Sequence, residues 1–285
     1  MLNNIFNTLK DMETFIQQDT SFIEKVSMGM LPGFSYMSKY GVNKEITKSS
    51  FPEDVCEQGG QYIYDAKNTA PIKYICSSDP LDSGKEIEIK GLDINGDEVT
   101  QKATLDGQNN VELTTHLYRN YRMKNRSNGL DILGTVYCHT DDAPTNGVPV
   151  PDKIRAIIDG ANNKTLMALY TVPKGKVAFW YKFEVGVELE GNTGALAEYA
   201  RSHFEVRPLD EVFSCEKSVT TMIGGNPIYS DERVFKSAIT ALSDIRIRVI
   251  EVSETMGVWG TFDLLLVDED LFSDEYLASI EQPGY

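Results

Sequence analysis

The chain has 285 residues, and 43 acidic against 27 basic side chains give it a net charge of −16. Phosphate backbones and anionic lipid surfaces repel so acidic a protein, so we expect neither nucleic acid nor a membrane as a partner. No apolar stretch reaches the roughly 18 residues that cross a bilayer, and the first residues lack a signal-peptide pattern. The widely spaced cysteines fit neither a zinc ribbon nor a disulfide framework, so we expect buried free thiols at Cys56, Cys76, Cys138 and Cys215. We also expect no metal and no cofactor, because the sequence lacks the motifs that bind them.

Residues 1–28 are predicted to be helical. Apolar residues recur three and four positions apart between Leu2 and Ile16, which places them on one helix face. Ser21, with Glu24 three residues later, resembles a capping box that opens a second short helix.

Residues 29–60 are predicted to form an extended arm without much regular structure, because prolines and glycines punctuate them. Long ordered arms are uncommon inside compact domains, so we expect this one to contact a neighbouring subunit. Phe34, Tyr36 and Tyr40 would then form an apolar patch at a symmetric interface between copies.

The segment 85–105 carries the clearest local signal, a β-hairpin. Ile87 and Ile89 alternate with charged residues, and Val99 begins a second alternating run. Asn95-Gly96 lies between the runs, and this pair favours a type I′ turn because both of its residues accept a positive φ.

Strand patterns continue through most of the remaining sequence. The proline-rich loop 141–151 is the best internal boundary, and 244–252 and 259–268 are further strands. We therefore expect a mainly β fold with one or two antiparallel, jelly-roll-like β-sandwich modules, an N-terminal helical segment and an extended arm. The expected division is 1–60 for the helix and arm, 61–145 and 146–267 for two parts of the β region, and 268–285 for an acidic tail, either solvated or a short docking helix.

The motifs tested for chemistry do not predict a catalytic residue or a ligand site. Asp93 could open a calcium loop, but Glu98 stands where the loop needs glycine. Cys138 and His139 are neighbours in a strand and so point to opposite faces. Arg119 and Arg122 open the one basic cluster, which is either a contact with the acidic surface of another copy or a solvated strand end.

Three segments together carry a resemblance to a known family. They are 53–62, with Glu53-Asp54-Val55 and Gly59-Gly60-Gln61-Tyr62; 91–107, with Gly91-Leu92-Asp93 and Leu105-Asp106-Gly107; and 168–176, with Tyr170-Thr171-Val172-Pro173. In this order and spacing they resemble virion structural proteins of tailed bacteriophages, over residues 40–190 and more loosely to 268. Cys56 departs from the family pattern, which often has tryptophan there.

The resemblance implies a non-enzymatic particle component with a β-sandwich body, and it supplies no catalytic residues. Such a protein is made in the host cytoplasm and resides in the virion as a homo-oligomer. It would act as a capsid decoration, collar, neck or tail-attached protein, with major capsid, portal, neck or tail proteins as partners.

Two other functions remain open at this stage. The first is a receptor- or carbohydrate-binding sandwich of the phage tail, with Tyr229 and Trp259 as contact residues. The second is a hydrolase with two carboxylates across a cleft.

Overall fold

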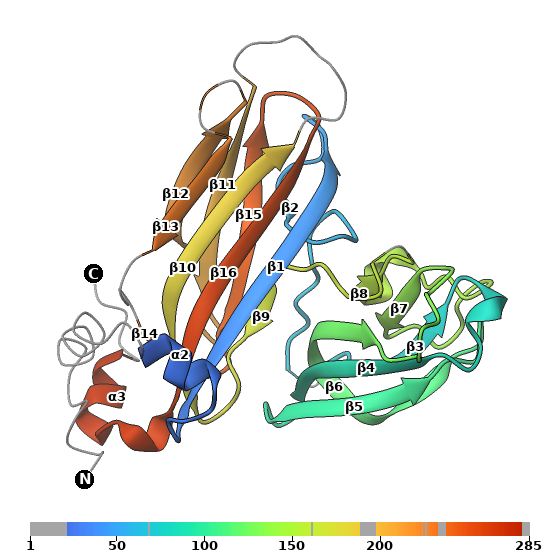
Figure 1. Cartoon of the computed structure of the whole chain (residues 1–285), viewed down its shortest axis with the longest axis horizontal. Coiled ribbons are helices and arrows are strands. Elements are labelled where there is room, and N and C mark those ends of the chain that lie inside the picture. Colours follow the sequence, from blue (N-terminus) through green and yellow to red (C-terminus); the bar gives the residue numbers. More distant parts are fainter. Residues whose placement is uncertain are drawn as a thin grey trace.

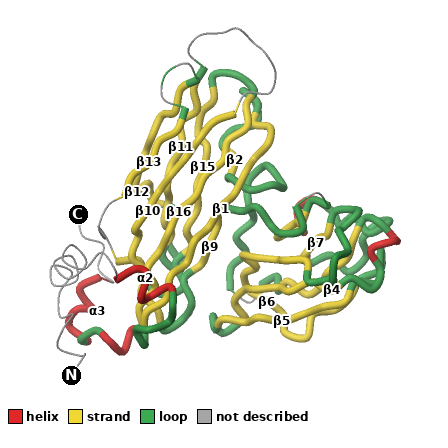
Figure 2. Tube along the Cα trace, in the orientation of Figure 1, coloured by secondary structure: helices red, strands yellow, loops and turns green. Residues whose placement is uncertain are grey.

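The computed structural model describes residues 22–67, 69–160, 162–188, 198–223, 225, 227–232 and 238–280. The described chain is mainly β, as predicted, and it forms two units that lie side by side (Figure 1). One is a tall sandwich of two antiparallel sheets, and the other is a smaller unit built on a six-stranded antiparallel sheet. Loops join the strands of both units, and the helical turns of the described residues are short (Figure 2).

The first sheet of the sandwich contains β1 (Phe34–Ile46), β16 (Met256–Asp268), β10 (Lys176–Glu188) and β13 (Ile228–Glu232), with β14 (Ala238–Ile239) also paired to β10. The second sheet contains β12 (Ser214–Met222), β11 (Tyr199–Arg207), β15 (Asp244–Val252) and β2 (Glu53–Asp54), with β9 (Leu169–Thr171) also paired to β15. The third sheet, in the smaller unit, runs β5 (Glu98–Thr104), β4 (Glu86–Asp93), β6 (Val111–Asn125), β3 (Ile72–Ser77), β7 (Val136–His139) and β8 (Ile154–Ile158).

Aromatic side chains from both sheets fill the core of the sandwich. Phe204 of β11 stacks on Trp180 of β10, with ring centroids 4.9 Å apart. Phe183 and Phe262, both of the first sheet, have ring centroids 5.7 and 5.6 Å from that of Phe204. Alternation along each strand sends these residues inward. The inner faces of the two sheets therefore share one hydrophobic core.

The smaller unit is an insertion into the sandwich. Residues 72–158 form all six of its strands and lie between β2 and β9, both of which belong to the second sheet of the sandwich. The expected division at 145/146 is therefore wrong. The loop 141–151 connects β7 to β8, which are neighbours in one sheet, so its prolines mark a turn inside the unit.

The predicted hairpin at 85–105 is confirmed, but its turn differs from the prediction. β4 and β5 pair in the register Ile89 to Gln101. Of the pair Asn95-Gly96, only Gly96 has a positive φ, +89°. The connection is therefore a wider loop than a type I′ turn. The Asp93 carboxylate accepts hydrogen bonds from the backbone N–H groups of Asn95 and Asp97, at 2.8 and 3.0 Å. The loop thus uses this carboxylate for its own backbone.

The prediction of an extended arm at 29–60 is wrong, because residues 34–46 form the long strand β1. This strand pairs with β16 along its length. Gly41 allows a close crossing there: a Cβ at this position would lie 2.2 Å from Ala168 N and from Val55 O. The glycine therefore serves backbone packing, whereas the sequence pattern indicated a break.

Two short helices cover the outer face of the first sheet at its lower end. The second predicted N-terminal helix is confirmed as α2 (Phe22–Ser27), and the first lies outside the described residues. α3 (Asp274–Ile280) belongs to the acidic tail, and Leu277 packs on the same apolar cluster as Phe22. The described residues also contain three single 3-10 turns: η2 (Pro80–Asp82), η3 (Pro151–Lys153) and η4 (Glu269–Leu271). Among the described helices, none has the length and apolar character needed to cross a membrane.

Candidate functional site at the junction of the two units

A buried ion pair joins the inserted unit to the sandwich. Arg119 of β6 donates from Nε to Asp244 Oδ1 at 2.9 Å and from Nη2 to Oδ2 at 3.1 Å. Each side chain is only 3% exposed. The bidentate geometry fixes both the separation and the relative orientation of the strands that carry the two groups. Thr171 and Arg207 of the sandwich also donate to the Asp244 carboxylate.

A second ion pair lies on the same outward face of the sandwich's second sheet. Arg246 donates from Nε to Glu205 Oε2 at 2.8 Å, and its Nη1 lies 3.4 Å from Asp54 Oδ1. Asp54 Oδ2 accepts a hydrogen bond from the backbone N–H of Tyr62 at 2.7 Å. Burial raises the pKa of Asp54 to about 6, although Arg246 opposes the shift.

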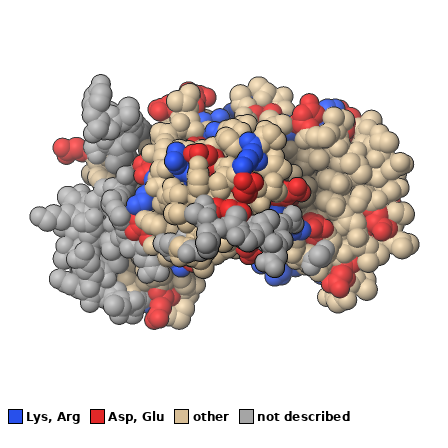
Figure 3. All heavy atoms as spheres, turned by 90° about the horizontal axis from the view of Figure 1, so that it is seen from above, with Lys and Arg blue, Asp and Glu red and all other residues tan. Residues whose placement is uncertain are grey.

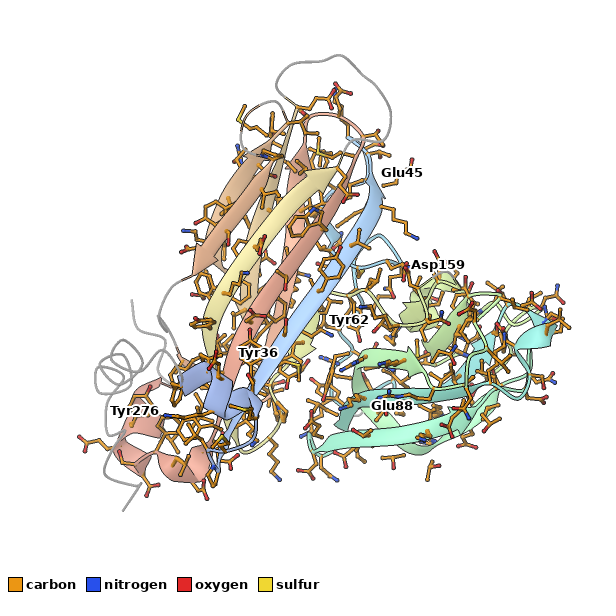
Figure 4. All side chains as sticks on the ribbon, viewed as in Figure 1. Tyr36, Glu45, Tyr62, Glu88, Asp159 and Tyr276 are labelled. Carbon is orange, nitrogen blue, oxygen red and sulfur yellow. The ribbon has the colours of Figure 1, made fainter. Side chains whose placement is uncertain are left out.

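Aromatic rings pack against the cations of this network. The guanidinium groups of Arg119 and Arg207 lie 5.3 and 4.8 Å from the ring centroid of Tyr64, and that of Arg246 lies 3.7 Å from Phe213. Tyr62, on the same connecting segment as Tyr64, lies between the two units (Figure 4). Rings stacked on guanidinium groups exclude water and strengthen the ion pairs beneath them.

The sequence-predicted contact residues do not form one exposed patch. Phe34 is 8% exposed and packs edge-to-face on Phe22, with ring centroids 5.8 Å apart, and Tyr36 is half-buried in the same cluster. Arg119 is buried in the junction. Both Phe34 and Arg119 are therefore unavailable to a second copy. Tyr40 is 45% exposed, and exposed Arg122 lines a cleft of about 230 Å³ between the units.

The sequence patterns did not identify Asp244, the acidic partner of Arg119 at the junction. The alternating segment 244–252 indicates one buried and one polar face, and a polar face is normally solvated. In the structure Asp244 and Arg246 occupy that face but are covered by the inserted unit and by Phe213. A signal existed in retrospect, since three acidic or basic residues alternate there with aliphatic ones.

Another buried polar pair lies inside the inserted unit. Cys76 Sγ is 3.2 Å from His139 Nε2, and the backbone N–H of Asp141 donates to His139 Nδ1. Both side chains are fully buried. Burial raises the pKa of the Cys76 thiol to about 12 and lowers that of His139 to about 4. The pair is therefore held as a neutral thiol and a neutral imidazole, without the thiolate that nucleophilic chemistry needs.

Within the described part of the chain, no group of three or more His, Cys, Asp or Glu side chains could hold a metal ion. All four cysteines are free there, and three of them are buried.

Comparison with known proteins gives no family for the chain. No protein-family model and no curated protein matches it. Among solved structures, the PBSX exported protein XepA aligns over 80% of this chain and 84% of its own, with 9% identity and a TM-score of 0.18. The VP2 subviral particle of infectious bursal disease virus aligns over 88% and 82%, with 12% identity and a TM-score of 0.16. Similarities this weak support no inference about fold or function.

Substitution of Arg119 by alanine should destabilise the protein strongly, because it leaves a buried carboxylate with less compensation. We expect a loss of about 3 kcal/mol in the free energy of unfolding, the lower end for a broken buried pair, since Arg207 still contacts Asp244. Urea unfolding measures the loss. Arg126→Ala, which breaks the exposed pair with Glu88, is the matched control and should change little. Equal effects of the two substitutions would contradict a structural role for the junction.

The His139 imidazole should make the protein acid-sensitive. Its pKa of about 4 lies below the ordinary histidine value of 6.5, so the unfolded chain binds the extra proton between these pH values. Stability is complete above pH 6.5 and falls as the pH drops towards 4. Asp54 acts in the opposite direction below pH 6, so the wild type is compared with His139→Gln. The stability advantage of the wild type over this variant should shrink from pH 6.5 to 4 in urea titrations, and parallel curves would refute the assignment.

Proposed function

We propose that the protein is a non-enzymatic structural component of a tailed-phage virion, acting through symmetric contacts between copies and with other virion proteins. The observation that carries the proposal is the junction. Two β units held at a fixed orientation by a buried ion pair make a rigid building block. The sequence resemblance over residues 40–190 gives the proposal its particular direction towards phage particles.

The outer surface of the described chain suits such a role. Acidic side chains are spread over both units on the face seen from above (Figure 3). This distribution favours solubility before assembly, because copies carrying a net charge of −16 repel one another at long range. Specific contact between copies then requires local apolar patches that overcome the repulsion.

The far end of the inserted unit offers such a patch. Leu81, Leu130 and Leu133 are 72%, 61% and 57% exposed. Their two loops are tied together, because Asp82 Oδ1 accepts hydrogen bonds from the Leu133 backbone N–H at 2.9 Å and from Lys85 Nζ at 2.6 Å. Apolar residues exposed on ordered loops are typical of surfaces that pack against another protein. We assign this leucine patch to contact with a second copy.

The leucine patch can be tested by self-association. The wild-type chain should form a defined oligomer in sedimentation velocity measurements at micromolar concentration. Leu81→Glu with Leu133→Glu should shift it towards monomer, because like charges would face each other across the interface. Val212→Glu with Leu209→Glu, two exposed positions of the sandwich, is the control. A wild-type monomer at high concentration would reject symmetric assembly.

Membership of a particle needs its own measurement. Mass spectrometry of purified phage particles should find the chain in a fixed ratio to the capsid protein. Recovery only from the soluble fraction of the lysate would refute the virion role.

One observation favours the receptor- or carbohydrate-binding alternative. Tyr40 and Trp259 lie together on the outer face of the first sheet, with ring centroids 6.4 Å apart and an angle of 30°. Gly186 makes room for the indole, since a Cβ there would lie 2.3 Å from the Trp259 ring. Tyr229 lies on the opposite face of the sheet, where its ring centroid is 6.3 Å from that of Phe183. The two predicted contact residues, Tyr229 and Trp259, are therefore separated.

Aromatic platforms of this kind can stack on sugar rings. If the alternative holds, glycan-array binding will be detected and Trp259→Ala will abolish it, while Tyr229→Phe will leave it intact. An array without binding would leave the structural role as the only function proposed for this chain.

A further inference from the structure

The junction also contains a cleft lined by cationic side chains. The cleft of about 230 Å³ lies between β1 of the sandwich and strands β4, β5 and β6 of the inserted unit. Its floor includes the buried ring of Tyr121. Four cationic side chains line it, from four separate segments of the chain: Lys39 of β1, Lys90 of β4, Arg122 of β6 and Lys164 of the segment that leads back to the sandwich.

None of these four cations forms an ion pair with any residue that the structure describes. Lys39 is the most constrained, at 7% exposed. Its ammonium donates to the Tyr121 backbone carbonyl and lies 5.7 Å from the centroid of the same ring. Lys90 stands directly opposite Arg122 in the pairing of β4 with β6. Like charges in directly opposed positions of a sheet are destabilising.

Two carboxylates lie near these cations, and neither forms an ion pair with any of the four. Glu98, the one acidic residue lining the cleft, accepts a hydrogen bond from the Tyr121 hydroxyl. Glu88, two residues from Lys90, forms a bidentate pair with Arg126, at 2.9 and 3.1 Å. The cleft therefore concentrates positive charge in a chain that is strongly acidic as a whole.

This arrangement is costly unless an anion enters the cleft. Burial, followed by the charge of Arg122, lowers the pKa of Lys39 to about 7, so its charged form is only partly populated at neutral pH, and an anion beside it would favour that form. Elsewhere at the junction the buried Arg119 and Arg246 have carboxylate partners. Local departures from such pairing are typical of ligand sites.

We propose that this cleft binds a compact tetrahedral oxyanion, with free phosphate as its ligand. The cations come from four segments and surround the space from several sides, which suits an ion whose acceptor oxygens point in all directions. A cleft of about 230 Å³ has room for one such ion and some of its hydration water. The site is independent of the structural role, and it would couple anion concentration to the stability of the junction.

Isothermal titration of the full-length protein with inorganic phosphate tests the site, with chloride holding the ionic strength constant. We expect saturable binding of one ion per chain. Arg122→Gln with Lys164→Gln should weaken it by about tenfold or more, as the loss of two charge-assisted contacts implies. Both side chains are exposed, so the variant should fold. Lys39→Met is a second variant and should abolish binding.

The control variant is Lys73→Gln with Lys174→Gln. It removes the same total charge from two cations that lie outside the cleft and also form no ion pair in the described chain. It should bind phosphate as the wild type does. Equal weakening in the control and cleft variants would show a diffuse charge effect and overturn the proposal. So would the absence of saturation, or tighter binding of the planar carboxylates of citrate than of phosphate.

Discussion

The ion pair between Arg119 and Asp244 decides how the two β units sit against each other. A buried pair adds little net stability compared with apolar residues of the same size, because both charges lose their hydration. It is far more sensitive to geometry, since any other arrangement leaves one charge buried without its partner. The pair therefore acts chiefly on orientation, and the surrounding rings make the penalty for misalignment larger.

The insertion topology reinforces this constraint. Two chain segments, 55–71 and 159–168, cross between the sandwich and the inserted unit, so the unit is anchored at both ends. Both segments contribute to the core of the inserted unit, through Tyr62 on the first and Met167 on the second. A unit held by two packed connections and a buried ion pair has little freedom to swing. This rigidity is what makes an architectural function reasonable for the chain, and it also fixes the width of the cationic cleft.

The junction contains both paired and unpaired cationic side chains. On one side, Arg119, Arg207 and Arg246 are matched by carboxylates and covered by rings. On the other, Lys39 and Arg122 line a cleft in which neither forms an ion pair with a described carboxylate. Paired charges stabilise one arrangement of the two units, whereas unpaired charges leave interaction energy available to a ligand. Under our proposals, one interface would fix the orientation of the two units and would also bind an anion.

The sequence by itself determined the mainly β fold, the hairpin of β4 and β5, and the short helix at Phe22, because alternation, turn residues and caps act over a few neighbouring positions. It misjudged the strand at 34–46, where Gly41 permits a close backbone crossing that a local pattern cannot distinguish from a break. Only the tertiary structure decided that residues 72–158 are an insertion, that the polar face of β15 is covered, and that Lys39 meets Arg122. These contacts join residues far apart in the chain, and local preferences carry no information about which distant charge will lie beside another.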